Sequence, residues 1–229
     1  GLNPGAIPAA VVQNANIDDD APDGDGGWGL RYSRTESAFD YAVTVQRNRQ
    51  STPYFAYDAP SNTLEAKYPR SWSSGADLGF ESGGITWRGE FAYLSDVPVT
   101  RTNGSYDTVE GINWAAGMEF FPGDGETRVN LQLVGVNLLD TPAIFDRDEI
   151  YSVNGDIDIP FARERWRLST RFFAGLNDND VYVNPELTFL GWQPHEVYVA
   201  AHYFNGADNT LGGFYKDKSL LTLGWRGQF

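Results

Sequence analysis

The stretch Leu221-Thr222-Leu223-Gly224-Trp225-Arg226-Gly227-Gln228-Phe229 alternates between two kinds of side chain. Its odd positions are apolar apart from one glycine, and polar residues or glycine lie between them. Successive side chains of a β-strand point to opposite faces of the sheet. The stretch therefore predicts a strand that has one apolar face and one polar face.

The same period of two recurs upstream, whereas helical periodicity is absent. The segments are residues 28–32, 41–46, 76–80, 85–93, 112–120, 128–133, 151–159, 166–174, 183–189 and 196–203. We therefore expect about eleven antiparallel strands. Tight turns at 82–84, 122–125 and 162–164 alternate with long polar connections around 50–70, 96–107, 138–149 and 206–217. Short turns at one end and long loops at the other are typical of an up-and-down transmembrane β-barrel.

Composition narrows the classes of protein. The chain has 17 Lys+Arg against 31 Asp+Glu and a net charge of -14, which disfavours nucleic acid as a partner. There is no cysteine, so disulfides and thiolate metal sites are excluded. The mean hydropathy is -0.41, and no apolar run reaches the roughly 20 residues of a transmembrane helix. Barrel strands need only about 9–11 residues with every second one apolar, so we expect residues 1–229 to form one outer-membrane barrel.

A water-soluble sandwich or jelly roll is the alternative architecture, because a half-buried sheet also alternates. A soluble sheet would not need so many strands that carry aliphatic and aromatic side chains on one face and Arg, Asp and Glu on the other. Aromatic residues also gather near the expected strand ends, where barrels carry interfacial girdles. These residues are Trp72, Phe121, Phe145, Phe161, Trp166, Trp192, Tyr203 and Phe229. The sequence therefore favours a barrel over a soluble sandwich.

Strand parity bears on the N-terminal region. With Phe229 in the periplasm, the strand at 28–32 runs from the extracellular side towards the periplasm. Residues 1–27 then form an extracellular loop or N-terminal extension. Single-chain bacterial barrels have an even number of strands. Either residues 7–13 add a weak twelfth strand, or the chain is the C-terminal part of a larger barrel. Pro4, Pro8 and a run of alanines favour the second expectation. The sequence shows no signal peptide, so we expect a mature form or a fragment.

The first hundred residues contain the stretches Asn3-Pro4-Gly5-Ala6-Ile7-Pro8, Thr52-Pro53-Tyr54, Tyr68-Pro69, Gly89-Glu90-Phe91-Ala92-Tyr93 and Val97-Pro98-Val99. These stretches resemble the C-terminal half of an uncharacterised outer-membrane barrel family, a domain of unknown function associated with proteobacterial export of lipids or hydrophobic compounds. This resemblance implies a barrel and a C-terminal part, and it transfers no binding residue. The terminal Gly224-Trp225-Arg226-Gly227-Gln228-Phe229 separately resembles the signal that the barrel-assembly machinery reads, with Phe229 at its end.

Charged and titratable side chains on the polar faces are the candidate pore-lining set. In a wide barrel they would line water and select solutes, and in a narrow one they would pair and fill the lumen. The sequence leaves both arrangements open. The set is Arg31, Arg88, Glu90, Glu119, Arg128, Asp156, Asp158, Arg167, Arg171, Glu186, His202 and Arg226.

Two other clusters contain residue types that serve in catalysis or metal binding. His202 could join Ser169 and Glu186 in a hydrolase constellation, but no nucleophile motif surrounds the serine, so we expect no enzyme. The acidic run at 18–25 offers oxygen ligands that calcium prefers. It lacks the Glu that completes a helix–loop–helix calcium site, so we expect a solvated loop. His195 reads as a turn residue. We expect no cofactor and no metal.

The expected function is a passive channel or export-associated pore for small or amphipathic solutes in the bacterial outer membrane. The alternative is a non-conducting scaffold or receptor that binds a protein partner through its extracellular loops. Outer-membrane lipid, lipopolysaccharide and the barrel-assembly machinery are the other expected partners.

Overall fold

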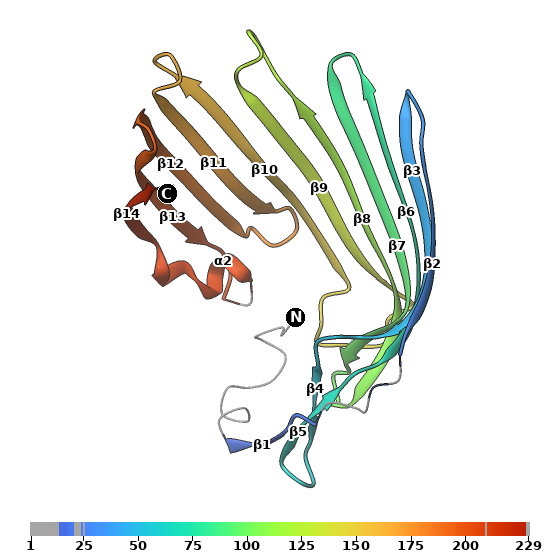
Figure 1. Ribbon diagram of the computed structural model, residues 1–229. Helices are drawn as coiled ribbons and strands as arrows, with labels where there is room; N and C mark the ends of the chain where they lie inside the picture. Colours follow the sequence, from blue (N-terminus) through green and yellow to red (C-terminus); the bar gives the residue numbers. More distant parts are fainter. Residues whose placement is uncertain (1–13, 21–23, 25, 209, 228–229) are drawn as a thin grey trace. The chain divides into compact units, whose positions relative to one another are not determined.

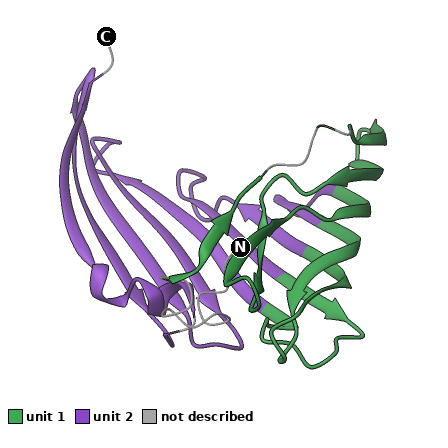
Figure 2. Cartoon of the chain, turned by 90° about the horizontal axis from the view of Figure 1, so that it is seen from below, with its two compact units in different colours: residues 1–78, 90–114, 135–150 green, residues 79–89, 115–134, 151–229 purple. Residues whose placement is uncertain are grey.

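The computed structural model describes the chain except residues 1–13, 21–23, 25, 209 and 228–229. Strands make up 69% of it and helices 4%, which confirms the all-β class. The chain divides into two compact units, coloured separately in Figure 2. Unit 1 comprises Gly1–Leu78, Glu90–Trp114 and Gly135–Ile150, and unit 2 comprises residues 79–89, 115–134 and 151–229.

Eleven strands form one hydrogen-bonded sheet in the order β14-β13-β12-β11-β10-β9-β8-β7-β6-β3-β2 (Figure 1). They are β2 (Trp28–Thr35), β3 (Phe39–Arg49), β6 (Arg70–Ser82), β7 (Ile85–Thr100), β8 (Tyr106–Phe120), β9 (Arg128–Leu139), β10 (Glu149–Phe161), β11 (Trp166–Gly175), β12 (Val181–Trp192), β13 (His195–Asn205) and β14 (Leu220–Gly227). These elements match the eleven expected segments. Among the described residues no hydrogen bonds close the sheet into a barrel, and β2 and β14 are its edge strands.

The tight turns obtain their geometry from residues that accept positive φ. Gly83 and Gly84 connect β6 to β7 with φ of 63° and 74°. Such a pair of left-handed residues matches the right-handed twist of a two-residue hairpin. The β10–β11 turn has the same handedness in Ala162, Arg163 and Glu164, with φ between 52° and 58°.

On β6 and β14, exposure along the strand is the reverse of that in a water-soluble sheet. On β6 the exposed positions include Trp72, Leu78 and Phe80, whereas Ser73 and Asp77 between them are half-buried. On β14, Leu221 is 78% exposed and Leu223 is 80% exposed. In a soluble sheet the apolar face is the covered one. Here the apolar face is open and the polar face is partly shielded.

The 50–70 connection differs from the expected polar loop, because it contains a sheet of its own. Strands β4 (Tyr54–Asp58) and β5 (Thr63–Lys67) pair antiparallel, and β1 (Asn16–Asp18) pairs parallel with β5 (Figure 1). Leu64 is buried in this sheet. The 206–217 connection likewise contains α2 (Leu211–Phe214) and η1 (Lys216–Lys218). None of the helical segments in the described part of the chain has the length and apolar composition needed to span a bilayer.

Tyr54 joins the small sheet to the rest of unit 1. Its hydroxyl donates to the Asp146 carboxylate at 3.1 Å and lies 2.6 Å from the Thr100 hydroxyl. The Thr100 backbone N–H also donates to Asp146. Thr100 and its neighbour Val99 are buried, so these polar groups satisfy one another away from water.

Expectations that fall on residues 7–13 and on Phe229 lie outside the described residues, as does part of the acidic run at 18–25. The twelfth strand and the terminal assembly signal therefore stay predictions.

Replacing Tyr54 by Phe should loosen the small sheet, because it leaves the Asp146 carboxylate and Thr100 without the hydroxyl. The expected cost is about 1–3 kcal/mol. Hydrogen exchange of β4 and β5 should accelerate, while exchange in β10–β13 stays unchanged.

The same contact predicts a pH dependence. Burial raises the pKa of Tyr54 from 10.0 to about 12, so folding favours the protonated phenol. Its contribution is full below pH 10.0 and is lost as pH rises towards about 12. Exchange in β4 should accelerate over that range in the parent and much less in Tyr54→Phe. Equal responses of the two proteins would contradict the assignment.

Candidate polar-face site

Strands β10–β14 of unit 2 carry a polar face made of alternate residues. The register sets Asp156 opposite Arg171, Ser169 opposite Glu186, and Glu196 opposite Arg226. The opposite face of the same strands carries apolar side chains such as Leu168, Leu187, Val199 and Leu223. We call these the polar face and the apolar face of unit 2. The alternation read from the sequence is confirmed on these five strands.

Arg128 of β9 is the centre of one ion-pair network. Its guanidinium binds both Asp156 and Asp158 of β10, the latter at 3.1 Å, and lies 3.7 Å from Glu119 of β8. Ser169 of β11 donates to the other oxygen of Asp158. Arg128 of β9 thus binds charged side chains of two neighbouring strands, β8 and β10, and reaches β11 through Ser169.

Arg226 of β14 is the centre of a second network. Both of its terminal nitrogens donate to Glu186 at 2.9 Å, and it lies 3.8 Å from Glu196. Its guanidinium carbon lies 4.0 Å from the ring centroid of Tyr198, in the geometry of a cation–π contact. Thr188 also donates to Glu186. This pairing fixes the side chains of β12, β13 and β14 on the polar face.

Unit 1 carries a smaller pair of the same kind. Arg31 of β2 donates to Asp77 of β6 at 2.8 Å and to Thr44 of β3 at 3.1 Å. All three side chains lie at polar positions of their strands. The expected pore-lining residue Arg31 is thus held by neighbours within its own unit.

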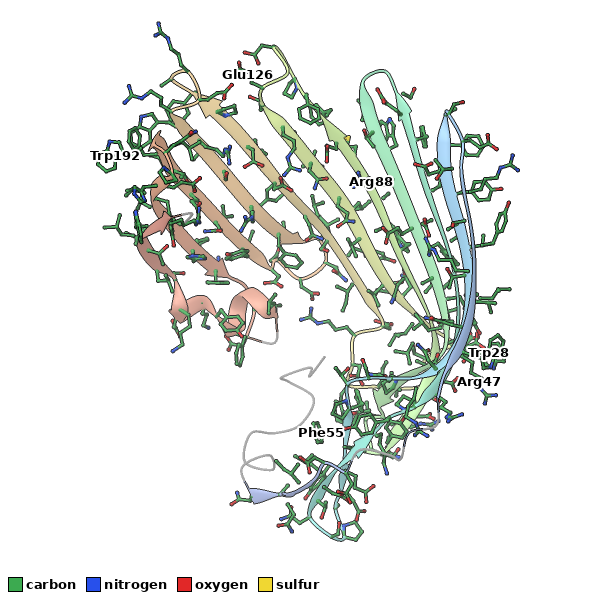
Figure 3. All side chains as sticks on the ribbon, in the orientation of Figure 1. Trp28, Arg47, Phe55, Arg88, Glu126 and Trp192 are labelled. Atoms are coloured by element: carbon green, nitrogen blue, oxygen red, sulfur yellow. The ribbon has the colours of Figure 1, made fainter. Side chains whose placement is uncertain are left out.

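The other expected residues are less constrained. Arg171 faces Asp156 and Asn184 in the register, but its side chain has no hydrogen bond or ion pair to any described residue. Arg167 faces Thr188 and acts on Asp158 through its charge alone. These exposed cations of β11 are available to water and solutes. Arg88, also exposed and visible in Figure 3, and Glu90 likewise have no such side-chain contact among the described residues.

The hydrolase constellation is not assembled. His202 Nδ1 lies 3.0 Å from the Tyr182 hydroxyl. Ser169 donates to Asp158, and Glu186 is bound by Arg226. Each of the three side chains is therefore engaged with a different partner. No cluster of three or more His, Cys, Asp or Glu in the described residues could hold a metal ion.

Aromatic side chains gather at strand ends, among them Trp72, Trp166 and Trp192 of the residues expected there. In unit 1 the Trp28 and Trp72 rings meet edge to face at 5.2 Å, and Arg47 lies over Trp72. Figure 3 shows Trp28 and Arg47 at the same end of the β2–β3 pair. In unit 2, Trp166 lies 4.9 Å from Phe189.

Phe189 in turn lies 5.4 Å from Trp192, which Figure 3 shows at the end of β12. Arg165 lies over the Phe189 ring. An aromatic ring beside an arginine suits a boundary between apolar and aqueous surroundings.

Sequence reasoning missed the aromatic residues of the polar face. Tyr182 and Phe204 occupy polar-face positions opposite each other. Each lies an even number of residues from a polar-face residue of its own strand, Tyr182 from Glu186 and Phe204 from His202. Alternation alone could therefore have placed both rings on the polar face. Tyr215, which contacts Phe204, carried no such signal because it lies in a connection.

Comparison of this chain with protein-family models, with curated proteins and with solved structures found no match.

Replacing an arginine that forms ion pairs should lower stability more than replacing one that forms none. Arg128→Gln leaves Asp156 and Asp158 without their shared cation and should lower the free energy of unfolding by about 1–3 kcal/mol, between the values for exposed and buried pairs. Arg171→Gln removes no contact and should stay within about 0.5 kcal/mol of the parent. Urea titration of the refolded protein measures both. A larger loss for Arg171→Gln would contradict this assignment of partners.

Proposed function

We propose that the chain is an outer-membrane β-barrel whose apolar face contacts lipid and whose polar face lines a water-filled passage for small or amphipathic solutes. The observation that carries this proposal is the reversed exposure of β6 and β14, where leucine, phenylalanine and tryptophan are open and Ser73, Asp77 and Thr222 are half-buried. Exposed apolar faces of this extent are costly in water and favourable in hydrocarbon.

A lipid environment would also require the sheet to close into a barrel. In hydrocarbon every backbone N–H and C=O needs a partner within the protein, so an open sheet edge cannot persist there. Strands β2 and β14 are the edges of the eleven-strand sheet. Closure through these edges, directly or with further strands, would satisfy both of them. The aromatic residues beside arginines at strand ends support an interfacial girdle that contacts lipid and lipopolysaccharide.

A passive channel agrees with the charge of the polar face. The polar face of β10–β14 carries three arginines, Arg167, Arg171 and Arg226, and four carboxylates, Asp156, Asp158, Glu186 and Glu196. This near balance contrasts with the net charge of -14 for the whole chain. A mixed face with free cations on β11 would admit polar solutes with weak selection by charge.

A non-conducting scaffold or receptor is the second candidate. The ion-pair networks of Arg128 and Arg226 favour it, because paired charges can fill an interior instead of lining water. The folded connections β4–β5 and α2–η1 favour it as well, since they offer shaped surfaces to a protein partner. Under either candidate, Phe229 would be read by the barrel-assembly machinery.

Lipid contact predicts a difference between adjacent residues of β14. Leu223→Arg places a charge on the apolar face and should destabilise the folded protein in lipid by about 2–4 kcal/mol if the residue lies near the midplane. Thr222→Arg adds the same charge to the polar face and should cost much less. Folding titrations from urea into lipid vesicles compare the two. Equal losses would show that the faces are assigned wrongly.

Conduction predicts a change of selectivity when the free arginines of β11 are reversed. Arg167→Glu with Arg171→Glu should shift the reversal potential of a planar bilayer towards cation selectivity, because the passage loses two positive charges and gains two negative ones. The sheet should still fold, as neither side chain is in a close ion pair. Heat-modifiable gel mobility checks folding.

The control reverses Asp58 and Glu65 of the small sheet in unit 1 to Lys, which changes the same amount of charge in a different sheet. Because Glu65 loses its ion pair with Lys67, the same gel assay must show that this variant folds. Absence of conductance in the folded parent, or a folded reversal variant with unchanged selectivity, would contradict the channel and leave the scaffold.

A further inference from the structure

Three arginines occupy the apolar face of unit 1, the face that carries Val45 of β3 and Trp72 of β6. Arg47 and Arg49 continue the alternation of Val45 along β3. Arg70 lies two residues before Trp72 on β6, and both are exposed. A cation is costly on a lipid-facing surface unless its charged end reaches the headgroups. We call Arg47, Arg49 and Arg70 the arginine cluster.

These arginines belong to strand ends that lie side by side. The Gln50 N–H donates to the Pro69 carbonyl at 3.0 Å, which joins the end of β3 to the start of β6. The Arg47 guanidinium lies 5.6 Å from the centroid of the Trp72 ring, and that ring meets Trp28 of β2 at 5.2 Å. Figure 3 shows Trp28 and Arg47 at this end of the β2–β3 pair. Cations and rings of three neighbouring strands thus gather at one place.

No carboxylate lies on this face of β2, β3 or β6, all of whose residues the structure describes. The face has one other charged side chain, Arg34, at the opposite end of β2. Arg34 forms an ion pair with Glu36 of the neighbouring turn. Positive charge without a carboxylate on the same face is therefore confined to the end with the arginine cluster, in a chain whose net charge is -14.

Arg47 has the donors most available to a ligand. Its guanidinium has no hydrogen bond or ion pair with a described residue, and a cation beside a ring keeps its N–H groups for another acceptor. Arg49 donates to the Tyr68 carbonyl at 3.3 Å, and Arg49 and Arg70 also interact with other residues. Arg47 is therefore the expected contact of an anion, and its two neighbours add to the positive potential there.

The arginine cluster lies at the end of the strands that carries a long connection. Residues 50–69 link β3 to β6 there, whereas residues 36–38 form a short turn between β2 and β3 at the opposite end. Outer-membrane barrels have their longer loops on the extracellular side. The cluster would then face the outer leaflet, whose lipid is lipopolysaccharide with phosphate groups on its lipid A portion.

We infer that the arginine cluster binds lipid A through its phosphate groups, with Arg47 as the principal contact. Guanidinium N–H groups pair with phosphate oxygens, often two at a time. Lipid A carries more than one phosphate, so several cations at one place suit it better than a phospholipid with a single phosphate. The rings of Trp28 and Trp72 suit the depth at which headgroup meets hydrocarbon. The inference rests on the proposed function, since it requires the apolar face to be in lipid.

Lipid A is the probe, added to the full chain refolded in detergent micelles, and native mass spectrometry measures how much stays bound. The parent should bind lipid A about 10-fold more tightly than dephosphorylated lipid A, because the latter lacks the groups that pair with arginine. It should also prefer lipid A to phosphatidylglycerol, which tests the source of the phosphate. Inorganic phosphate at the same concentration should not displace lipid A.

Arg47→Gln should weaken lipid A binding by about 10-fold. Arg34→Gln is the matched control, because it removes the same charge from the same face at the opposite end of the strands. It should bind like the parent. Heat-modifiable gel mobility checks that both variants fold.

Equal binding of lipid A, its dephosphorylated form and phosphatidylglycerol would overturn the inference, as would displacement by inorganic phosphate. Unchanged affinity in folded Arg47→Gln, or an equal loss in Arg34→Gln, would overturn it as well. A protein that inserts into vesicles but shows no preference for lipid A would refute only this site. Failure to insert would refute the proposed function itself, and lipid A binding without conductance would refute only the channel.

Discussion

Most of the structure depends on the alternation of side chains along hydrogen-bonded strands, which on β6 and β14 leaves the apolar side open. Period-two alternation fixes which residues share a face, and hydrogen bonding between neighbours carries that assignment from strand to strand. A slip of one residue would move Leu221 and Leu223 to the polar face and Arg226 to the apolar one. The networks of Arg128 and Arg226 resist such a slip, because each joins side chains that meet only in the observed register.

The strands of the large sheet could be predicted from the sequence because their signal is local. Alternation in residues 166–174 or 196–203 needs no knowledge of the rest of the chain, and β11 and β13 are found there. The small sheet could not be predicted in this way. Its anchor, Tyr54, depends on Thr100 and Asp146, which are 46 and 92 residues away.

The candidate site was predicted in part for the same reason. The alternation along the strands predicts one shared face for Arg167, Arg171, Asp156, Asp158 and Glu186. It does not predict which arginines form ion pairs, because Arg128 and Arg226 reach their carboxylates through side-chain rotamers and strand register. The rings of Tyr182, Phe204 and Tyr215 combine both cases. Tyr182 and Phe204 have the parity of the polar face, whereas Tyr215 lies in a connection held by the buried contact of Asp180 with Gly212.

The central claim is that the apolar face meets lipid, and the absence of native cysteine allows a direct test. Leu223→Cys and Thr222→Cys would each carry a fluorescent label in protein refolded into vesicles of brominated lipid. Quenching by the lipid should be strong at residue 223 and weak at residue 222, with aqueous iodide giving the opposite order. Equal quenching at both residues, or stronger lipid quenching at 222, would contradict the account.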